Sequence, residues 1–420
     1  MTIEERNHKL TQQRWLVLIA CCVANLCIGA LYAWSVFSGP MAEYLNSLNG
    51  TQKTAADLAI VFSIANGDAF ITMILGGALD EKIGSRMVIL IGVLVFGAGF
   101  VVCGLAKGTM ALIIGFSLMA GLANGFAYVC TVSNSVKFFP DMKGLAGGIG
   151  TASFGISAVI IPPIADALNR SVGVCKAFII FGVVIIILAF VSSIFIKNCP
   201  DDYVPDGWTP PESEKLENGT DKDKNWKQML STPIFYVMLG MLFVGCTLGL
   251  MMVSEASAIA QTMIGMTTTT AALVVSVLAL FNTGGRIVAG WLSDKIGRIN
   301  TLTCAFILAI CSLLLMYVSG GVASSAMFVI GICMIGLFYG SFMGVYPGFT
   351  SDQFGIKYSS LNYGIMFLGF SAGGLVGPMI MQGIFNSTGS YRGAFIIALI
   401  FALCGLAVSF LYRVMKKKEH

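Results

Sequence analysis

A single arginine lies inside an otherwise apolar stretch of the chain. Arg286 belongs to the run 269–292 and stands about one helical turn before Gly290. A guanidinium group in hydrocarbon is costly and keeps its proton, so it requires an anionic partner or a wet cavity. Its planar fork matches a carboxylate through two parallel hydrogen bonds. Asn282 lies one turn away on the same helix face, where its amide could donate a further bond. The alternative is an arginine that extends its head group to the membrane interface.

A carboxyl group within the second long apolar run is a candidate for proton coupling. Asp68 lies near the middle of 54–79, and an ionisable residue at that depth is a functional hypothesis by default. The alternative is a structural acid that stays neutral or hydrogen-bonded. Both histidines, His8 and His420, lie at the ends of the chain, and no two cysteines form a CxxC pair. We therefore expect no metal site, no cofactor and no enzymatic activity.

The composition indicates which class of protein carries these residues. The chain has 420 residues, of which 56% are hydrophobic and only 11% are charged, and its mean hydropathy is +0.85. A water-soluble surface needs far more charge than this, and a disordered chain is far less apolar. A net charge of +4 with no basic patch beyond the C-terminal tail argues against nucleic-acid binding. The sequence predicts a polytopic membrane protein.

Twelve apolar stretches are long enough to cross a bilayer, because a spanning helix needs about 20 such residues. They are longer than barrel strands and apolar on every side, which favours helices. The expected fold is therefore an all-α membrane protein with twelve transmembrane helices. We place them at 15–37, 54–79, 86–106, 110–138, 145–168, 174–196, 232–257, 269–292, 299–319, 323–349, 359–385 and 392–414.

A polar segment rich in proline and charge divides these helices into six and six. The composition of 197–231 is typical of a flexible linker. Most lysines and arginines fall on the same side of the membrane as this linker, so the positive-inside rule predicts that both termini and the linker are cytoplasmic. The predicted parts are a segment 1–14, a bundle 15–196, the linker 197–231, a bundle 232–414 and a basic tail 415–420.

The two six-helix halves repeat the same features. The stretch GALDEKIGSR at 77–86 joins the second and third helices, and GWLSDKIGR at 290–298 joins the eighth and ninth. Tyr128 in the fourth helix and Tyr339 in the tenth hold equivalent positions. Six helices per half give both halves the same orientation. Parallel six-helix pseudo-repeats are one known transporter architecture.

The doubled loop pattern G-x-x-x-[DE]-[KR]-x-G-x-[KR] resembles the major facilitator superfamily. The first copy matches the family pattern less closely than the second, because Glu81 occupies the acidic position and Ser85 precedes Arg86. Three further stretches are similar to the branch that contains the oxalate:formate antiporter and the monocarboxylate transporters: 137–148, Asn282-x-x-x-Arg286 and 351–364. The resemblance implies that the loop motifs control conformation during alternating access. These gating residues are Gly77, Glu81, Lys82, Arg86, Gly290, Asp294, Lys295 and Arg298.

The resemblance also implies roles for residues in the cavity. The branch uses an arginine at the position of Arg286 to hold the substrate carboxylate. Many members carry an aspartate where Asn282 stands, so we do not expect proton transfer through that position. In the oxalate:formate antiporter, a lysine stands at the position of Phe370. Phe370 carries no charge, so we expect Arg286 to be the one cation in the cavity, and one cation neutralises one carboxylate. We therefore expect a monocarboxylate such as lactate, pyruvate or formate. The aromatic residues expected around the substrate are Tyr32, Tyr128, Tyr339, Phe154, Phe367 and Phe370.

We therefore predict a secondary active transporter for a small organic anion. It would work by alternating access, either as a proton symporter or as an antiporter that exchanges anions. We expect a functional monomer in the plasma or inner membrane. The alternatives are a dicarboxylate (oxalate):formate antiporter, a drug exporter of the same fold, and a nutrient sensor that binds without transporting.

Overall fold

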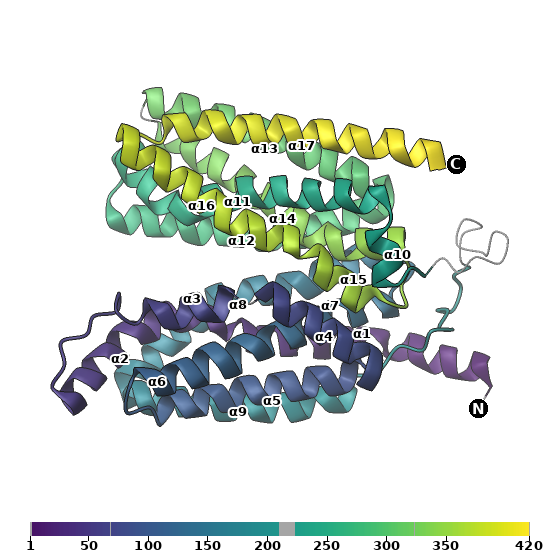
Figure 1. Cartoon of the computed structure of the whole chain (residues 1–420), viewed down its shortest axis with the longest axis horizontal. Helices are drawn as coiled ribbons and strands as arrows, with labels where there is room; N and C mark the ends of the chain where they lie inside the picture. The colour runs from purple at the N-terminus through teal and green to yellow at the C-terminus, as the bar shows by residue number, and fades with distance from the viewer. Residues whose placement is uncertain (1, 68, 210–222, 323, 420) are drawn as a thin grey trace. The chain divides into compact units, whose positions relative to one another are not determined.

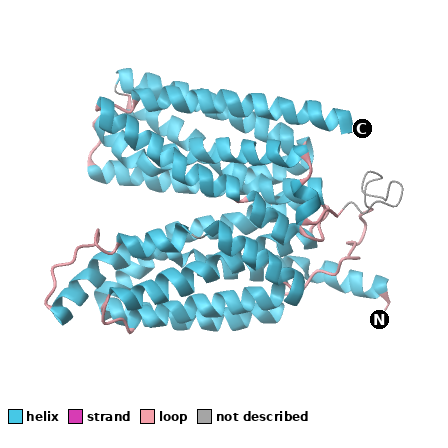
Figure 2. Ribbon diagram, in the orientation of Figure 1, coloured by secondary structure: helices cyan, strands magenta, loops and turns pink. Residues whose placement is uncertain are grey.

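The regular structure in the described part of the chain is helical throughout (Figure 1, Figure 2). The structure is a computed structural model, and it describes residues 2–67, 69–209, 223–322 and 324–419. In these residues, 11 helical stretches are long and apolar enough to cross a membrane, and a bent pair on either side of residue 68 makes up to 12. The prediction of an all-α, polytopic membrane protein is confirmed.

The elements of the first half run from the N-terminus to the predicted linker. They are α1 (Ile3–Ile28), the 3-10 helix η1 (Gly29–Ala33), α2 (Trp34–Asn49), α3 (Ala59–Gly67), α4 (Ala69–Ile83), α5 (Ser85–Gly104), α6 (Thr109–Leu112), the π-helix η2 (Ile113–Gly121), α7 (Leu122–Phe138), α8 (Lys143–Val172) and α9 (Val174–Phe195).

The elements of the second half follow the linker. They are α10 (Trp226–Leu230), α11 (Pro233–Ile264), α12 (Thr268–Ile296), α13 (Arg298–Val322), α14 (Ser325–Phe354), α15 (Ser359–Met366), α16 (Leu368–Thr388) and α17 (Arg392–Glu419).

Most helix ends lie close to the predicted spans, but the first helical stretch is much longer than predicted. It continues through α1, η1 and α2 from Ile3 to Asn49, whereas the apolar run covers 15–37. A capping box at Thr2 and Glu5 starts α1, since each residue's side chain accepts a hydrogen bond from the other's backbone N–H. Hydropathy measures the apolar length and cannot detect a polar extension of this kind.

The internal repeat is visible in the backbone as well as in the sequence. Gly84, between α4 and α5, has φ and ψ of 81° and 152°. Gly297, between α12 and α13, has φ and ψ of 88° and 151°. Side chains with a Cβ rarely adopt this positive φ, so both turns require glycine. The two loop motifs thus form the same sharp connection between consecutive helices.

The helices form two compact units, which we describe separately. Unit 1 contains Met1–Asp141, Ser153–Asp223 and Gly355–Ile365. Unit 2 contains Met142–Ala152, Lys224–Phe354 and Met366–His420. The first turns of α8 therefore belong to unit 2, although the rest of that helix belongs to unit 1. Most of α15 belongs to unit 1 in the same way.

Aromatic side chains fill the core of each unit. In unit 1, Phe37 stacks on Phe178 with ring centroids 4.1 Å apart, and Phe100 lies 5.6 Å from Phe178. In unit 2, the ring of Phe342 lies 5.1 Å from those of Phe306 and Phe338. Edge and stacked contacts of this kind add to the packing that holds spanning helices together in lipid.

The start of the predicted linker contacts the first turns of α1. Arg6 forms an ion pair with Asp202 at 2.6 Å, and this hydrogen bond lowers the pKa of the Asp202 carboxyl. The Thr11 and Tyr203 hydroxyls lie 3.2 Å apart, and His8 Nδ1 lies 2.6 Å from Asp206 Oδ2. This part of the segment is held against the helix, while residues 210–222 are outside the described chain.

Glycines on α14 let that helix approach α12 at the level of Arg286. A Cβ on Gly340 would lie 2.2 Å from the Asn282 carbonyl oxygen, and one on Gly344 would lie 2.2 Å from the Arg286 carbonyl oxygen. Gly148 of α8 makes a similar approach, 2.4 Å from the same Arg286 oxygen. Small residues allow such close backbone contact between membrane helices. They fix the position of α12 and of the arginine that it carries.

We expect the substitution Gly344→Ala to destabilise the protein. The added methyl group meets backbone that cannot rotate away, and overpacking of this kind costs about 1–3 kcal/mol. The matched control is Gly284→Ala on α12, where an added Cβ has nothing within 4 Å and the free energy of unfolding should change by no more than about 0.5 kcal/mol. Thermal unfolding in detergent measures both. Equal melting temperatures for the two variants would contradict the assigned contact.

Candidate functional site

Arg286 is buried in unit 2. Its residue exposure is 7%. Nη1 donates to the carbonyl oxygen of Thr151 at 2.7 Å, and Nε donates to Asn282 Oδ1 at 3.5 Å. Thr151 lies in the part of α8 that belongs to unit 2, and Asn282 precedes Arg286 by one turn of α12. Asn282 and Arg286 thus lie on one face of α12 and form a hydrogen bond with each other.

The charge of this guanidinium is not neutralised by the described residues. Its recorded partners are a backbone carbonyl and a side-chain amide, and no Asp or Glu in the described part of the chain forms an ion pair with it. Nη2 donates to none of the described residues, so part of the fork is available for another acceptor. An arginine keeps its charge, and a buried charge needs a partner of opposite sign. The site can therefore bind an anion, and a carboxylate suits the fork.

Aromatic residues predicted for the cavity lie in the same unit as Arg286. Phe370 on α16 is half-buried and stacks on Phe367, with ring centroids 4.3 Å apart. Tyr339 on α14 is buried. Its ring packs against Gly249 of α11, where an added Cβ would lie only 2.4 Å from the ring. The pair Phe367 and Phe370 thus presents an apolar surface where the resemblance expected a second cation.

The other three predicted aromatic residues form a group of their own in unit 1. The ring of Phe154 lies 5.4 Å from Tyr32 and 4.9 Å from Tyr128. Tyr128 is buried, whereas Tyr32 is 38% exposed. Phe154 thus joins an aromatic ring of η1 to one of α7. The structure brings these three residues together, and their place around a substrate stays a prediction.

Asp68, the predicted candidate for proton coupling, lies outside the described residues. In the described part of the chain, no group of three or more His, Cys, Asp and Glu side chains is placed to hold a metal ion.

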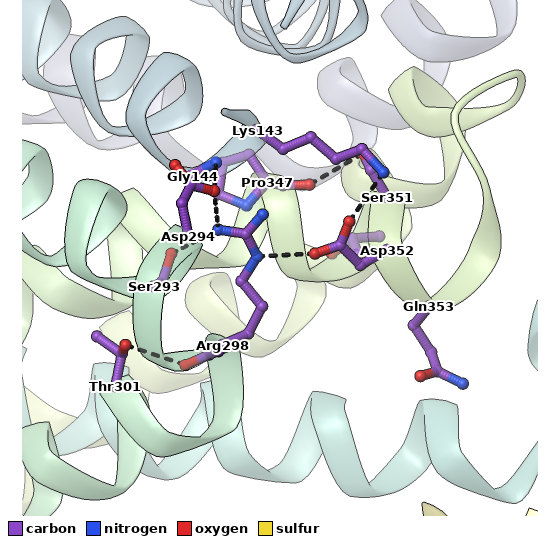
Figure 3. Close-up of polar contacts among 12 residues, drawn as sticks. Lys143, Gly144, Ser293, Asp294, Arg298, Thr301, Pro347, Ser351, Asp352 and Gln353 are labelled. Atoms are coloured by element: carbon purple, nitrogen blue, oxygen red, sulfur yellow. Dashed lines mark hydrogen bonds and ion pairs between the residues drawn. The ribbon is translucent and has the colours of Figure 1, made fainter. Parts of the chain in front are cut away.

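The second loop motif forms a cluster of charges in unit 2 (Figure 3). Asp294 accepts hydrogen bonds from the backbone N–H groups of Gly144 and Leu145, both at 2.8 Å. It also accepts one from Arg298 Nη1 at 2.6 Å. The carboxylate thus lies at the N-terminus of α8, where the helix dipole and unsatisfied N–H groups favour negative charge. Gly290 also packs closely on this turn, since a Cβ there would lie 2.2 Å from the Gly144 carbonyl oxygen.

Asp352 completes this cluster from the end of α14. Arg298 Nε donates to it at 2.8 Å, and Lys143 Nζ donates at 2.9 Å. Figure 3 shows the Arg298 guanidinium between the carboxylates of Asp294 and Asp352. The side chains of Lys143 and Arg298 are only 4% and 11% exposed. The cluster therefore ties α8, α12, α13 and α14 together through buried opposite charges.

The first loop motif uses a different acid from the one that the sequence pattern suggested. Asp80 is buried, accepts from Ser85 Oγ at 2.6 Å and from the Ser360 hydroxyl, and lies 3.6 Å from Lys137 Nζ. The neighbouring Glu81 is exposed. The sequence pattern could not show which of the adjacent acids Asp80 and Glu81 is buried. The first copy does differ from the second, because Ser85 follows Gly84 where Arg298 follows Gly297.

The remaining residues of the two loop motifs pack against neighbouring residues or are exposed. Gly77 packs against the backbone of α15, since a Cβ there would lie 2.5 Å from the Leu361 Cα. Lys82 and Arg86 are exposed, and Arg86 Nε donates to the Ser193 carbonyl oxygen at 2.9 Å. Lys295 extends over the ring of Trp291, 4.0 Å from its centroid.

The family comparison agrees with this arrangement of helices and loop motifs. The family model described as Major Facilitator Superfamily matches residues 21–357 and 264–420. The chain belongs to the major facilitator superfamily, a family of membrane transporters.

Individual relatives point to one part of this family. The chain is 28% identical to the oxalate:formate antiporter of Oxalobacter formigenes, over 97% of this chain and 94% of that protein. It is 22% identical to monocarboxylate transporter 12 of Homo sapiens, over 94% of this chain and 78% of that protein. The sequence resemblance to this branch is therefore confirmed.

A solved structure supports the fold alone. The transporter FucP in its outward conformation aligns with a TM-score of 0.69 and 13% sequence identity, covering 94% of this chain and 98% of that one. The predicted major facilitator fold is confirmed by this likeness.

Proposed function

We propose that this protein transports a small monocarboxylate across the membrane by alternating access. The observation that carries the proposal is the buried Arg286 guanidinium, whose described partners are a carbonyl and an amide. A carboxylate bound to the fork neutralises this charge and lowers the cost of closing a low-dielectric site around it. The oxalate:formate antiporter and the monocarboxylate transporter among its relatives are consistent with such a substrate.

The choice of a monocarboxylate depends on the number of cations. Phe370 stacks on Phe367 at the position where the resemblance expected a lysine. A dicarboxylate at Arg286 would keep one negative charge that these rings cannot neutralise. A lactate-, pyruvate- or formate-like anion has one carboxylate and a small remainder that aromatic walls can enclose. Tyr339 in unit 2, and Tyr32, Tyr128 and Phe154 in unit 1, are the further residues that we assign to substrate binding.

The positive charge of Arg286 also determines how transport is coupled to a proton or to a counter-anion. An empty site would have to dehydrate a bare guanidinium before the protein could reorient, and this cost favours anion exchange. Proton symport needs an acid that compensates Arg286 in the empty state. Asp68 is our candidate for that acid, because Asn282 cannot ionise.

The two loop-motif clusters are proposed to stabilise one conformation of the transport cycle. Asp294, Arg298 and Asp352 hold the first turn of α8 in unit 2, and Asp80 holds the start of α15 in unit 1. These contacts would have to break in another conformation. We further propose that the protein acts as a monomer with both termini in the cytoplasm, as the distribution of lysine and arginine indicates.

A thermal-shift panel on the purified protein tests the substrate class. Lactate, pyruvate, formate, oxalate and a hydrophobic drug are compared between pH 5 and pH 8. We expect monocarboxylates to raise the melting temperature more than oxalate at equal ionic strength, because ligands that bind only the folded state stabilise it. A larger shift with oxalate would indicate a dicarboxylate antiporter, and a shift with the drug alone would indicate an exporter. Either result would overturn the proposal.

A further inference from the structure

One cation of the second loop motif and three described cations of α17 lie outside the charge clusters described above. Lys295 belongs to the second loop motif, and Arg413, Lys416 and Lys417 lie in the last two turns of α17. None of the four forms an ion pair with an acid among the described side chains. The inner cations of the same unit, Lys143 and Arg298, are neutralised by Asp294 and Asp352. Among the described side chains, positive charge without an ion pair is therefore concentrated in the last two turns of α17.

Hydrogen bonds connect Arg413 to the turn that follows Lys295. Arg413 Nη2 donates to Asn300 Oδ1 and to Thr303 Oγ1, both at 2.9 Å. Asn300 in turn donates through Nδ2 to the Ile296 carbonyl oxygen at 2.7 Å. Arg413 Nε is buried and has no partner among the described residues. Its partners are neutral, so the guanidinium is fixed in orientation while its charge remains available.

Each of two cations lies over an exposed aromatic ring. Lys295 Nζ is 4.0 Å from the centroid of Trp291, which is 44% exposed. Arg413 Cζ is 5.2 Å from the centroid of Phe410, which is 51% exposed. Val414, one turn after Phe410 on α17, is exposed as well. A tryptophan ring beside a cation, as at Trp291 and Lys295, is typical of the depth at which lipid head groups meet acyl chains.

We propose that Lys295, Trp291, Phe410 and Arg413, with Lys416 and Lys417 beside them, bind the phosphate head group of an anionic phospholipid. We call this set the α17 basic site. Arg413 can donate to a phosphate oxygen through Nη1, because Nε is buried and Nη2 already donates to Asn300 and Thr303. Lys295 supplies a second positive charge at the α12–α13 turn. The rings of Trp291 and Phe410 lie against the glycerol and the first part of the acyl chains. The anionic surface of a leaflet attracts juxtamembrane lysine and arginine through the same forces.

The full-length protein in detergent tests the site. It is titrated with dioleoyl-phosphatidylglycerol, with dioleoyl-phosphatidylcholine and with inorganic phosphate, while the melting temperature and the number of lipids retained in native mass spectrometry are recorded. We expect phosphatidylglycerol to stabilise the protein and to remain bound, with little effect of the other two probes. Equal responses to both lipids would overturn the proposal. A response to inorganic phosphate that matches phosphatidylglycerol would also overturn it, because the site would then bind free phosphate.

Variants locate the effect at the α17 basic site. The double substitution Lys295→Gln and Arg413→Gln should raise the half-saturating phosphatidylglycerol concentration about tenfold or more. Arg413→Lys keeps the positive charge and should retain most of the response to phosphatidylglycerol. It shows whether the loss in the double variant comes from lost charge or from misfolding. The control is Lys107→Gln with Lys176→Gln, which removes the same charge from sites outside this set. Retention of the wild-type response in the Lys295/Arg413 double variant, or an equal loss in the control, would contradict the assigned site.

Discussion

Transport of the monocarboxylate should be lost in the Arg286→Ala variant. Removing one partner of a desolvated charge pair costs about 2–5 kcal/mol, so the rate at low substrate concentration should fall about 30-fold or more. The alanine side chain also opens space beside Asn282 and the Thr151 carbonyl, but it offers no charge to a carboxylate. Uptake into proteoliposomes at a concentration below half-saturation measures the loss.

Two further variants separate the role of the charge from that of the fork. Arg286→Lys keeps the positive charge but loses the planar pair of donors, so uptake should also fall strongly. The control is Arg170→Ala, because the Arg170 side chain is 80% exposed and its ion pair among the described residues is with Asp166 on its own helix. It should transport like the wild type. Full transport of a carboxylate by Arg286→Ala would show that the anion does not bind this residue.

Loss of the Asp352 carboxylate should destabilise unit 2. In Asp352→Ala, Lys143 and Arg298 keep their positive charges in a site where their side chains are only 4% and 11% exposed. An uncompensated buried charge of this kind costs about 3–5 kcal/mol. We expect a large decrease in melting temperature and a loss of transport, because the first turn of α8 is held through the same cluster. Thermal unfolding in detergent measures the first effect.

A second substitution tests whether the excess of buried positive charge is the cause. Adding Lys143→Ala to Asp352→Ala removes one of the two cations that contacted Asp352, while Arg298 keeps its ion pair with Asp294, so part of the lost stability should return. Asp166→Ala serves as the control, since the ion pair of Asp166 with Arg170 is exposed and such pairs contribute at most about 1 kcal/mol. Additive losses from Lys143→Ala and Asp352→Ala would contradict a direct interaction between these residues.

The transmembrane fold could be predicted from the sequence because hydropathy and repeated motifs are local properties. The apolar runs gave the spanning helices, and the matching turns at Gly84 and Gly297 followed from the doubled loop pattern. The polar extension of α1 was not predicted, since its capping residues lie outside any apolar run. Similarly, the composition of 197–231 indicated a linker but did not reveal the contact of Asp202 with Arg6.

The site residues were predicted less completely, because burial depends on helices that are distant in the sequence. The side-chain type and position of Arg286 singled it out within one helix. The position of Asp80 in the first motif depends on which of two adjacent acids faces Ser85 and Ser360, and helix rotation decides this. The contact of Lys143 with Asp352 joins α8 to α14, and no spacing rule predicts such a pair.

Counterflow in proteoliposomes tests the central claim most directly. Vesicles that contain the wild-type protein are loaded with unlabelled lactate or formate and diluted into a trace of the labelled acid. The account predicts transient accumulation of label above equilibrium in loaded vesicles, with no accumulation in vesicles that contain Arg286→Ala. Absence of counterflow for every small monocarboxylate tested, in protein whose melting temperature shows that it is folded, would contradict the account.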